Sequence, residues 1–263
     1  MIPASFCNLF GYRPSQGMVD LLGVTSFSPS FDAVGIITKQ LPNMFQIAEK
    51  CWTKAPRSVR LKSIKYAKSL FHELLPIEAM LEWEVRLSKS NWRLEEVPSL
   101  SKLTLTQAHN IHNVILGREI DLQYGQWIDA TNPKLSEETL DYLKIIRGKS
   151  FKKFVETKKK REFFSDSLQG FFDSGEVLMI PTSPGQAPNE SFIDDAFLIN
   201  QRRLYAIAEV AGLAQITLPM LPMLPMLPML PMLSVEGIPM GISLLAHPGE
   251  DRLLFEAASR LLD

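Results

Sequence analysis

A nucleophilic side chain needs a base to accept its proton and hydrogen-bond donors that face the developing negative charge. The hydroxyl groups that we considered as nucleophiles belong to Ser5, Ser15, Ser28, Ser30 and Ser183. No GxSxG elbow occurs, and the sequence contains no HExxH, GxGxxG, phosphate-cradling loop or paired CxxC pattern. Short motifs alone therefore predict no self-contained catalytic site.

Histidine is the other residue type that could do chemistry here. His109 and His112 occur in the stretch His-Asn-Ile-His, so both side chains would share one face of a helix and could contact one metal ion. Protein zinc sites use three or four ligands, and no third ligand stands nearby in the sequence. We therefore predict no metal or cofactor site, and we expect the isolated His72 and His247 to be packed or exposed.

The composition also limits the class of partner. The formal net charge is −1, which gives no electrostatic signal for a nucleic-acid partner. The basic run Lys158–Arg161 is flanked by acidic residues, so we predict a solvated helix face there. Cys7 and Cys51 suit a reducing compartment, and no secretory n-region precedes an apolar stretch, so we predict a cytoplasmic protein.

Residues 218–232 are five copies of Leu-Pro-Met. Proline at every third position removes backbone donors and clashes with a helix, so this apolar segment is not predicted to cross a membrane. The fixed backbone angle of proline favours a polyproline II conformation. Two interpretations stay open: a ligand for an aromatic-lined groove, and a tandem expansion tolerated within a loop, which we favour because flanking charges are absent.

Hydrophobic periodicity predicts the elements that must position any site. Gly11–Gly17 is a turn-forming cluster, and residues 21–39 predict short strands and loops. One predicted helix starts at Pro42. A second covers about Ser69–Leu87, with a kink or break at Pro76. Three more cover Thr106–Ile128, Leu135–Arg147 with a cap at Ser136, and about 150–172.

The second half of the chain has short apolar runs that predict strands between helices. Val177–Ile180 predicts a buried strand that leads into a loop, and Gln215–Leu218 and Gly241–Ala246 predict two further strands. Helices are predicted over about Asp194–Val210 and Asp251–Leu262, and the dipole of the first explains Asp194 and Asp195 at its start. Strands and helices in this order predict an α/β fold, a layered sheet covered by helices in a single domain over residues 1–263.

Several blocks resemble the amidase signature family in the right order along the chain. They are Ile2–Cys7, Gly11–Gly17, Ser28–Gly35, Gly117–Trp127, Val177–Pro188, Ala211–Pro219 and Gly237–Leu245. The resemblance is greatest to the short amidases that include the enzymes cleaving indole-3-acetamide. It implies an amidase-signature-type mixed sheet and hydrolysis of the carbon–nitrogen bond of a small amide substrate, giving an acid and ammonia.

In that family a Ser–cis-Ser–Lys triad performs the hydrolysis. The family pattern Gly-Gly-Ser-x-Arg-x-Pro-Ala aligns with Pro3 and Ala4, which places Met1 at the arginine and the nucleophile ahead of this sequence. The resemblance thus implies that the three catalytic residues and part of the sheet lie upstream, that the fold is incomplete, and that these 263 residues are inactive alone. We therefore predict no catalytic residue within them.

The remaining residues should form the wall of the active-site cleft. We expect the loop Pro181–Pro188, at a strand end, to border the cleft. We expect the helical insertion over about 69–172 to choose the acyl group. The alternative is a non-catalytic scaffold or a binding module that uses the proline-rich run.

Overall fold

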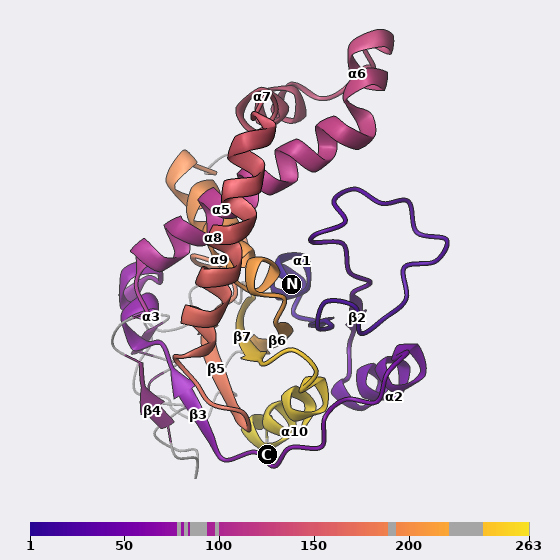
Figure 1. Ribbon diagram of the computed structural model, residues 1–263. Coiled ribbons are helices and arrows are strands. Elements are labelled where there is room, and N and C mark those ends of the chain that lie inside the picture. Colours follow the sequence, from indigo (N-terminus) through magenta and orange to yellow (C-terminus); the bar gives the residue numbers. More distant parts are fainter. Residues whose placement is uncertain are drawn as a thin grey trace.

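The computed structural model describes residues 1–77, 80, 81, 84, 94–97, 100–188, 193–220 and 239–262. Within this part of the chain a seven-stranded sheet has the order β2-β1-β6-β7-β5-β3-β4. The strands are β1 (Phe10–Arg13), β2 (Ile36–Thr38), β3 (Ser63–Tyr66), β4 (Leu94–Glu96), β5 (Glu176–Pro181), β6 (Ala214–Met220) and β7 (Met240–Ala246). Helices pack on both faces of this sheet, which confirms the predicted α/β fold class (Figure 1).

The sheet is mixed. Strands β3, β4 and β5 are parallel neighbours, whereas β7 runs antiparallel to both β5 and β6. At the other side of the sheet, β1 pairs antiparallel with β2 and with β6. The first strand of the chain therefore lies beside one that starts about two hundred residues later.

Strand β5 shows why the layered arrangement is stable. Leu178 and Ile180 belong to the apolar core on one face of the sheet, and Val177 and Met179 belong to the core on the other face. Successive side chains of a strand point to opposite faces, so a strand covered on both sides reads as a continuous apolar run. The predicted strand over Val177–Ile180 is confirmed, with one further residue at each end.

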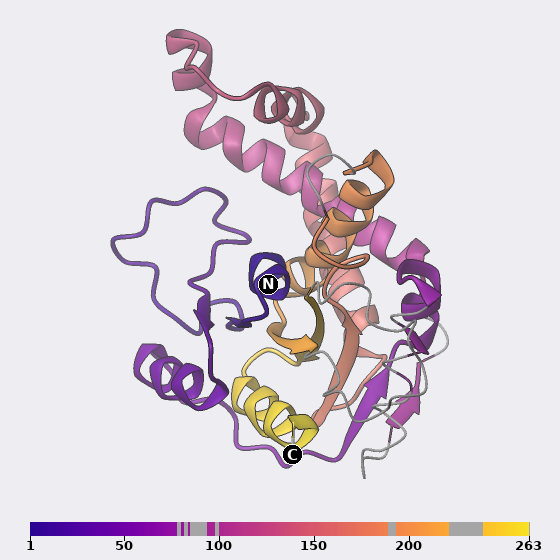
Figure 2. The same cartoon turned by 180° about the vertical axis from the view of Figure 1, so that it is seen from behind.

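The larger helical layer covers the face of Leu178. It contains α3 (Lys68–Leu74), α5 (Lys102–Ile120), α7 (Glu137–Ile146), α8 (Phe151–Gln169) and α9 (Asp195–Ala211). Helices α5, α8 and α9 pack against one another. After Ile120 the chain forms a π-helical turn, η1 (Asp121–Gly125), and then α6 (Gln126–Thr131). Figures 1 and 2 show that α6, α7 and the end of α5 project beyond the sheet as an arm.

The opposite face is covered by α2 (Leu41–Cys51) and α10 (Asp251–Leu262), which contact each other. Both were predicted from their apolar stripes. Pro42 stands in the first turn of α2, where its missing N–H costs no hydrogen bond. Ser136 caps α7 by accepting a hydrogen bond from the Thr139 N–H at 3.3 Å, which confirms the predicted cap.

The first residues differ from the prediction. The chain begins with the short helix α1 (Ile2–Phe6), and Phe10–Arg13 form strand β1 within the stretch that we predicted as a turn cluster. The reason is tertiary, because β1 finds backbone partners on both sides in β2 and β6. Within residues 21–39 only Ile36–Thr38 form a strand, and the preceding residues form a long loop.

Strands β3 and β4 were not predicted. They are short, and β4 lies inside the range 69–172 that we expected to be a helical insertion, so this range also supplies a sheet edge. Helix α3 ends at Leu74, with Leu75 extended before Pro76, so the proline breaks the predicted helix. Part of the remaining stretch to Leu87, and residues 221–238 with most of the Leu-Pro-Met run, lie outside the described residues.

A search of the described helices for a membrane-spanning segment finds none with the required length and apolar character.

Candidate functional site

A cavity of about 390 Å³ opens beside α1. One wall is Met1–Pro3, and another is the loop after β1, through Phe31, Ala33 and Gly35. The remaining lining side chains belong to Arg13 of β1, Gln215 of β6, and Tyr205 and Glu209 of α9. The cavity thus lies where the first helix, the first strand and α9 meet, and its lining carries both an acidic and a basic group.

Arg13 is the basic group, and its residue is only 7% exposed. Its guanidinium donates to the carbonyl oxygens of Leu213 at 3.3 Å and Phe31 at 3.1 Å, and to Oε1 of Gln16 at 3.4 Å. Burial lowers the pKa of Arg13, while the charges of Glu209 and Asp251 act in the opposite direction. This arginine therefore fixes the loop around Phe31 against the sheet through neutral acceptors.

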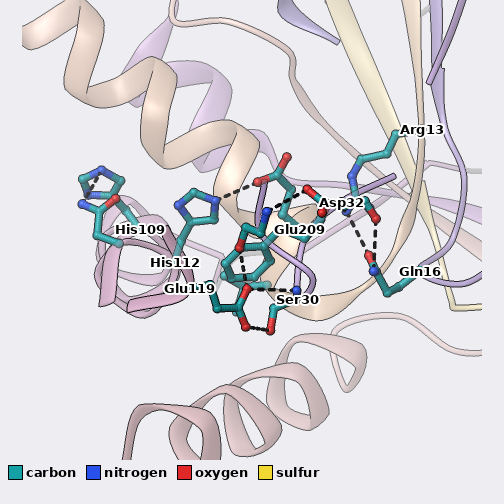
Figure 3. Close-up of polar contacts among 12 residues, drawn as sticks. Arg13, Gln16, Ser30, Asp32, His109, His112, Glu119 and Glu209 are labelled. Atoms are coloured by element: carbon teal, nitrogen blue, oxygen red, sulfur yellow. Dashed lines mark hydrogen bonds and ion pairs between the residues drawn. The ribbon is translucent and has the colours of Figure 1, made fainter. Parts of the chain in front are cut away.

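Glu209 is the acidic group. Its Oε2 lies 2.9 Å from Nε2 of His112, which is almost completely buried on α5. The His112 ring stacks on Phe31 with 4.5 Å between centroids and meets the Tyr205 ring edge-on at 5.4 Å. Figure 3 shows the His112 ring directed toward the Glu209 carboxylate between the two helices. Aromatic packing therefore holds the imidazole in place, and the imidazole holds the carboxylate.

A buried polar cluster lies on the sheet next to the cavity. The hydroxyl of Ser243 is 2.8 Å from that of Thr182 and 3.1 Å from that of Thr217, and it accepts a hydrogen bond from Nε2 of Gln215 at 2.8 Å. Ser5 of α1 is fully buried against Gly241 of β7, and its hydroxyl has no hydrogen-bond partner in this part of the structure. Gln215 connects the cluster to the cavity because it lines both.

Glu119 organises the loop that forms the outer wall. Its carboxylate accepts from the Ser28 hydroxyl at 2.6 Å, from the Ser30 N–H at 3.0 Å and from the Ser30 hydroxyl at 2.5 Å. Figure 3 shows Ser30 and Glu119 side by side. Arg161 of α8 donates to the Ser30 carbonyl at 3.1 Å and lies over the Phe31 ring, so the loop is held from two helices.

The two histidines of the predicted helix face do not converge. His112 contacts Glu209, whereas Nε2 of His109 lies 3.1 Å from the amide nitrogen of Asn113. A search of the described residues finds no group of three His, Cys, Asp or Glu side chains that could hold a metal ion. Burial lowers the pKa of His109 to about 4, and the positive charges of His112, Arg203 and Arg202 add to this effect.

The other singled-out histidines are packed or paired. His247 lies 2.7 Å from the Phe172 carbonyl oxygen and 3.2 Å from Oε1 of Gln169, so it is a packed residue. His72 is partly exposed and lies 3.5 Å from Glu84. Neither lines the cavity beside α1.

The side chains of the basic run Lys158–Arg161 have two different environments in the structure. Its three lysines are exposed as predicted, but Arg161 turns inward and donates to the carbonyl oxygens of Val210 at 2.8 Å and Glu209 at 3.4 Å. The prediction of a fully solvated face is wrong at this residue, because position 161 continues the buried stripe of Phe154, Thr157 and Phe164 at helical spacing. Burial lowers the pKa of Arg161.

Four of the five candidate serines donate to acceptors other than lysine. The Ser15 hydroxyl donates to Asp251 at 2.6 Å, and that of Ser183 donates to the Gly185 carbonyl at 2.5 Å. Ser28 and Ser30 bind Glu119, and Ser5 is buried as described above. Asp194 caps α9 by accepting from the Phe197 N–H at 2.6 Å, which confirms its predicted place at a helix start.

The loop Pro181–Pro188 follows β5, at the strand end where we expected it. Its Thr182 N–H donates to the Gly241 carbonyl at 3.2 Å, and Thr182 belongs to the polar cluster around Ser243. It does not line the cavity beside α1 directly. Instead the loop is connected to the cavity through Ser243, whose hydroxyl contacts both the Thr182 hydroxyl and the side chain of Gln215.

A second hollow, of about 550 Å³, lies on the arm between η1, α6 and the end of α7. Its two carboxylates pair with its arginine: Arg147 donates to Asp121 at 2.5 Å and to Asp129 at 3.0 Å. The Asp121 carboxylate also accepts the Gly148 N–H at 3.0 Å. These contacts tie α7 to η1 and leave the hollow with a structural role.

Sequence reasoning missed Arg13, Glu209 and Gln215. Glu209 had a readable signal, since it is a single carboxylate within the otherwise apolar stretch Ala206–Ala211. Buried acidic residues are rare unless they are paired, so this position could have been marked. Arg13 and Gln215 had no such signal, because only the pairing of β1 with β6 places them opposite each other.

Known proteins similar to this chain are amidases and their relatives. The Amidase family model matches residues 1–77, which contain α1, β1 and the cavity loop. Amidase 1 of Arabidopsis thaliana is 22% identical over 306 residues, covering 99% of this chain and 66% of that protein. The chain is similar to proteins of the amidase signature family over nearly its whole length.

Solved structures show the same fold. The chain superposes on a crystal structure of an amidase with a TM-score of 0.82 and 18% identity, covering 99% of this chain and 59% of the other. Chloroplastic outer envelope protein 64 of Arabidopsis thaliana is a further relative, 22% identical over 304 residues that cover 99% of this chain and 47% of that protein. The chain thus spans about half to two thirds of the relatives it matches.

Proposed function

We propose that these residues form the C-terminal part of the catalytic domain of an amide hydrolase, which converts a small carboxylic amide into an acid and ammonia. One observation carries the proposal: the cavity of about 390 Å³ is lined by Met1–Pro3. That segment resembles the residues that directly follow the nucleophile in the amidase signature pattern. A substrate in the cavity would therefore lie next to the place where the nucleophile enters.

In this proposal the chain supplies the walls and an upstream segment of a longer protein supplies the triad. Amide hydrolysis needs an activated hydroxyl, a base and oxyanion donors. The hydroxyls of Ser15, Ser28 and Ser30 donate to carboxylates, which leaves them without the lysine that would activate them. We propose that the 263 residues alone do not turn over an amide.

The experiment compares two proteins in an ammonia-release assay with butanamide. One is the 263-residue chain, and the other carries an N-terminal extension with Gly-Gly-Ser-Ser and a lysine, taken from an amidase relative. We expect ammonia only from the extended protein, and no ammonia when its nucleophilic serine is changed to alanine. Steady turnover by the 263-residue chain, after rigorous removal of contaminating enzymes, would refute the proposal that an upstream segment supplies the catalytic triad.

The sequence resemblance suggests a small aromatic amide, indole-3-acetamide, as one candidate substrate. The extended protein should then hydrolyse indole-3-acetamide with a higher kcat/KM than butanamide. An equal or lower kcat/KM for indole-3-acetamide would contradict this candidate substrate but not the proposed hydrolysis of amides. The cytosol is the proposed location, to be checked by fractionation of cells that express a tagged protein.

A second candidate is a non-catalytic scaffold or binding module. The observation that favours it is the similarity to outer envelope protein 64, whose name refers to a location and not to a reaction. The Leu-Pro-Met run would be the ligand segment in this case. Deleting Leu221–Met232 and repeating a partner pull-down tests the idea, and an unchanged set of partners would count against it.

A further inference from the structure

We infer that Glu209 selects substrates that carry an amino group, by accepting a charge-assisted hydrogen bond within the cavity, and that His112 is the residue that positions it. The inference rests on the proposed function, since it takes the cavity as the place where the amide is bound. It goes beyond that function by naming a chemical class of substrate, small amino amides, which differs from the aromatic amide that the sequence resemblance suggests.

The first argument is geometric. His112 contacts only one carboxylate oxygen of Glu209, Oε2, at 2.9 Å. The other oxygen, Oε1, has no hydrogen-bond partner within the described part of the chain, and the Glu209 side chain is 25% exposed where it lines the cavity. A carboxylate accepts several hydrogen bonds, so the free oxygen can serve a ligand while the other holds its place.

The second argument concerns charge. Across the described residues, neither a lysine or arginine nitrogen nor the Met1 amino nitrogen lies within 4 Å of the Glu209 carboxylate. Two neighbouring guanidinium groups have other partners: Arg13 donates to the Leu213 and Phe31 carbonyls, and Arg161 donates to the Val210 carbonyl. A partly desolvated carboxylate without a cationic partner favours a ligand that brings a positive charge.

The charge of Glu209 acts on two basic groups that line the cavity. Burial lowers the pKa of Arg13 and that of the Met1 amino group, and in each case the charge of Glu209 acts in the opposite direction. A cationic ligand is attracted by Glu209 and repelled by Arg13 and the Met1 amino group, so its own amino group is directed toward Glu209 on α9.

The third argument is the precision with which the carboxylate is held. His112 is 3% exposed, and its ring is fixed by the stack on Phe31 at 4.5 Å and by the edge contact with Tyr205 at 5.4 Å. Tyr205 and Glu209 stand four residues apart on α9 and line the same cavity. A ring that is clamped in this way orients a carboxylate with little loss of entropy when a ligand binds.

Two amides of equal size provide the probe pair. 3-Aminopropanamide carries an ammonium group at pH 7, and butanamide replaces it with a methyl group. Ligand-observed NMR titrations of the 263-residue chain at low salt give both dissociation constants. We expect the cationic amide to bind about tenfold more tightly, the size of one charge-assisted hydrogen bond.

Glu209→Gln should abolish this ratio and leave the affinity for butanamide unchanged, because glutamine keeps the size and an acceptor for His112. Glu256→Gln on α10 is the matched control, since Glu256 contacts Arg260 at the surface and should leave the ratio intact. His112→Phe keeps an aromatic ring in the stack but removes the contact to Oε2. It should lower the ratio severalfold without changing butanamide binding, which a purely structural role of His112 would not do.

A second variant keeps the inference testable if Glu209→Gln does not fold. Ala33→Glu adds a second carboxylate to the cavity lining and should raise the affinity for 3-aminopropanamide severalfold, with no gain for butanamide. A wild-type ratio near one, or a ratio that Glu209→Gln leaves unchanged, would overturn the inference. The proposed hydrolysis is judged separately, by ammonia release from the extended protein.

Discussion

The hydroxyl of Tyr12 donates a hydrogen bond of 2.6 Å to Oδ1 of Asp251, a residue 239 positions away in the sequence. The same carboxylate accepts from the Ser15 N–H at 2.8 Å and from the Ser15 hydroxyl at 2.6 Å. Tyr12 also accepts from the indole N–H of Trp52 at 2.9 Å. One fully buried carboxylate at the start of α10 thus ties the first strand to the last helix.

We predict that Asp251→Ala destabilises the protein by about 3–5 kcal/mol, because it leaves three buried donors without an acceptor. Tyr12→Phe should cost about 1–2 kcal/mol, since it removes one donor while two others keep their partner. Urea unfolding followed by circular dichroism measures both, with Asp141→Ala at the exposed Lys144 pair as control. If the double variant loses the full sum of the two single losses, the residues do not act as one network.

Gly117 marks the closest approach of α5 to α7. A Cβ atom at this position would lie 1.9 Å from the Ile146 carbonyl oxygen, which is closer than any real contact. Gly117→Ala must therefore push the end of α7 away, and we expect a loss of about 2–4 kcal/mol in the free energy of unfolding. Gly185→Ala is the control, because its Cβ would meet ordinary contacts of 3.8 Å and 3.9 Å. Equal melting temperatures for the two variants would contradict the packing described here.

Glu119 holds the cavity loop through Ser28 and Ser30. Glu119→Ala should leave the helix in place but free the loop, because it removes three acceptor contacts at once. Hydrogen–deuterium exchange should then accelerate at least tenfold over residues 26–33, as expected for an opening eased by about 1.4 kcal/mol or more. Glu138→Ala, at an exposed position on α7, is the control. Unchanged exchange in the loop would show that Arg161 alone suffices to hold it.

The lowered pKa of His109 predicts that the stability of the protein depends on pH. Its folded pKa is lowered to about 4 from 6.5, so the unfolded chain binds the proton more readily between these values. Stability is therefore fully present above about pH 6.5 and decreases as the pH falls toward 4. His109→Gln should lose less stability than wild type between pH 7 and pH 4, by at most about 3 kcal/mol. Parallel urea titrations at the two pH values give this difference, and identical losses would contradict it.

Local patterns predicted most regular elements of the larger helical layer and the central strand. The stripes of α2 and α10, the break before Pro76 and the caps Ser136 and Asp194 depend on neighbours a few residues away, so the sequence shows them directly. Strands β1, β3 and β4 escaped prediction because they are three or four residues long and form only against distant partners. The π-helical turn Asp121–Gly125 likewise interrupts a helix whose apolar spacing reads as continuous.

By itself the sequence determined the family resemblance, the fold class and the residue types that had to be buried. The tertiary structure alone decided which charges meet, as when Glu209 of α9 comes to lie beside His112 of α5 and shares a cavity with Arg13 of β1. The physical reason is that periodicity tells which face of a helix or strand is covered but not by what. The covering partner is set by the order of strands in the sheet and by the packing of helices across it.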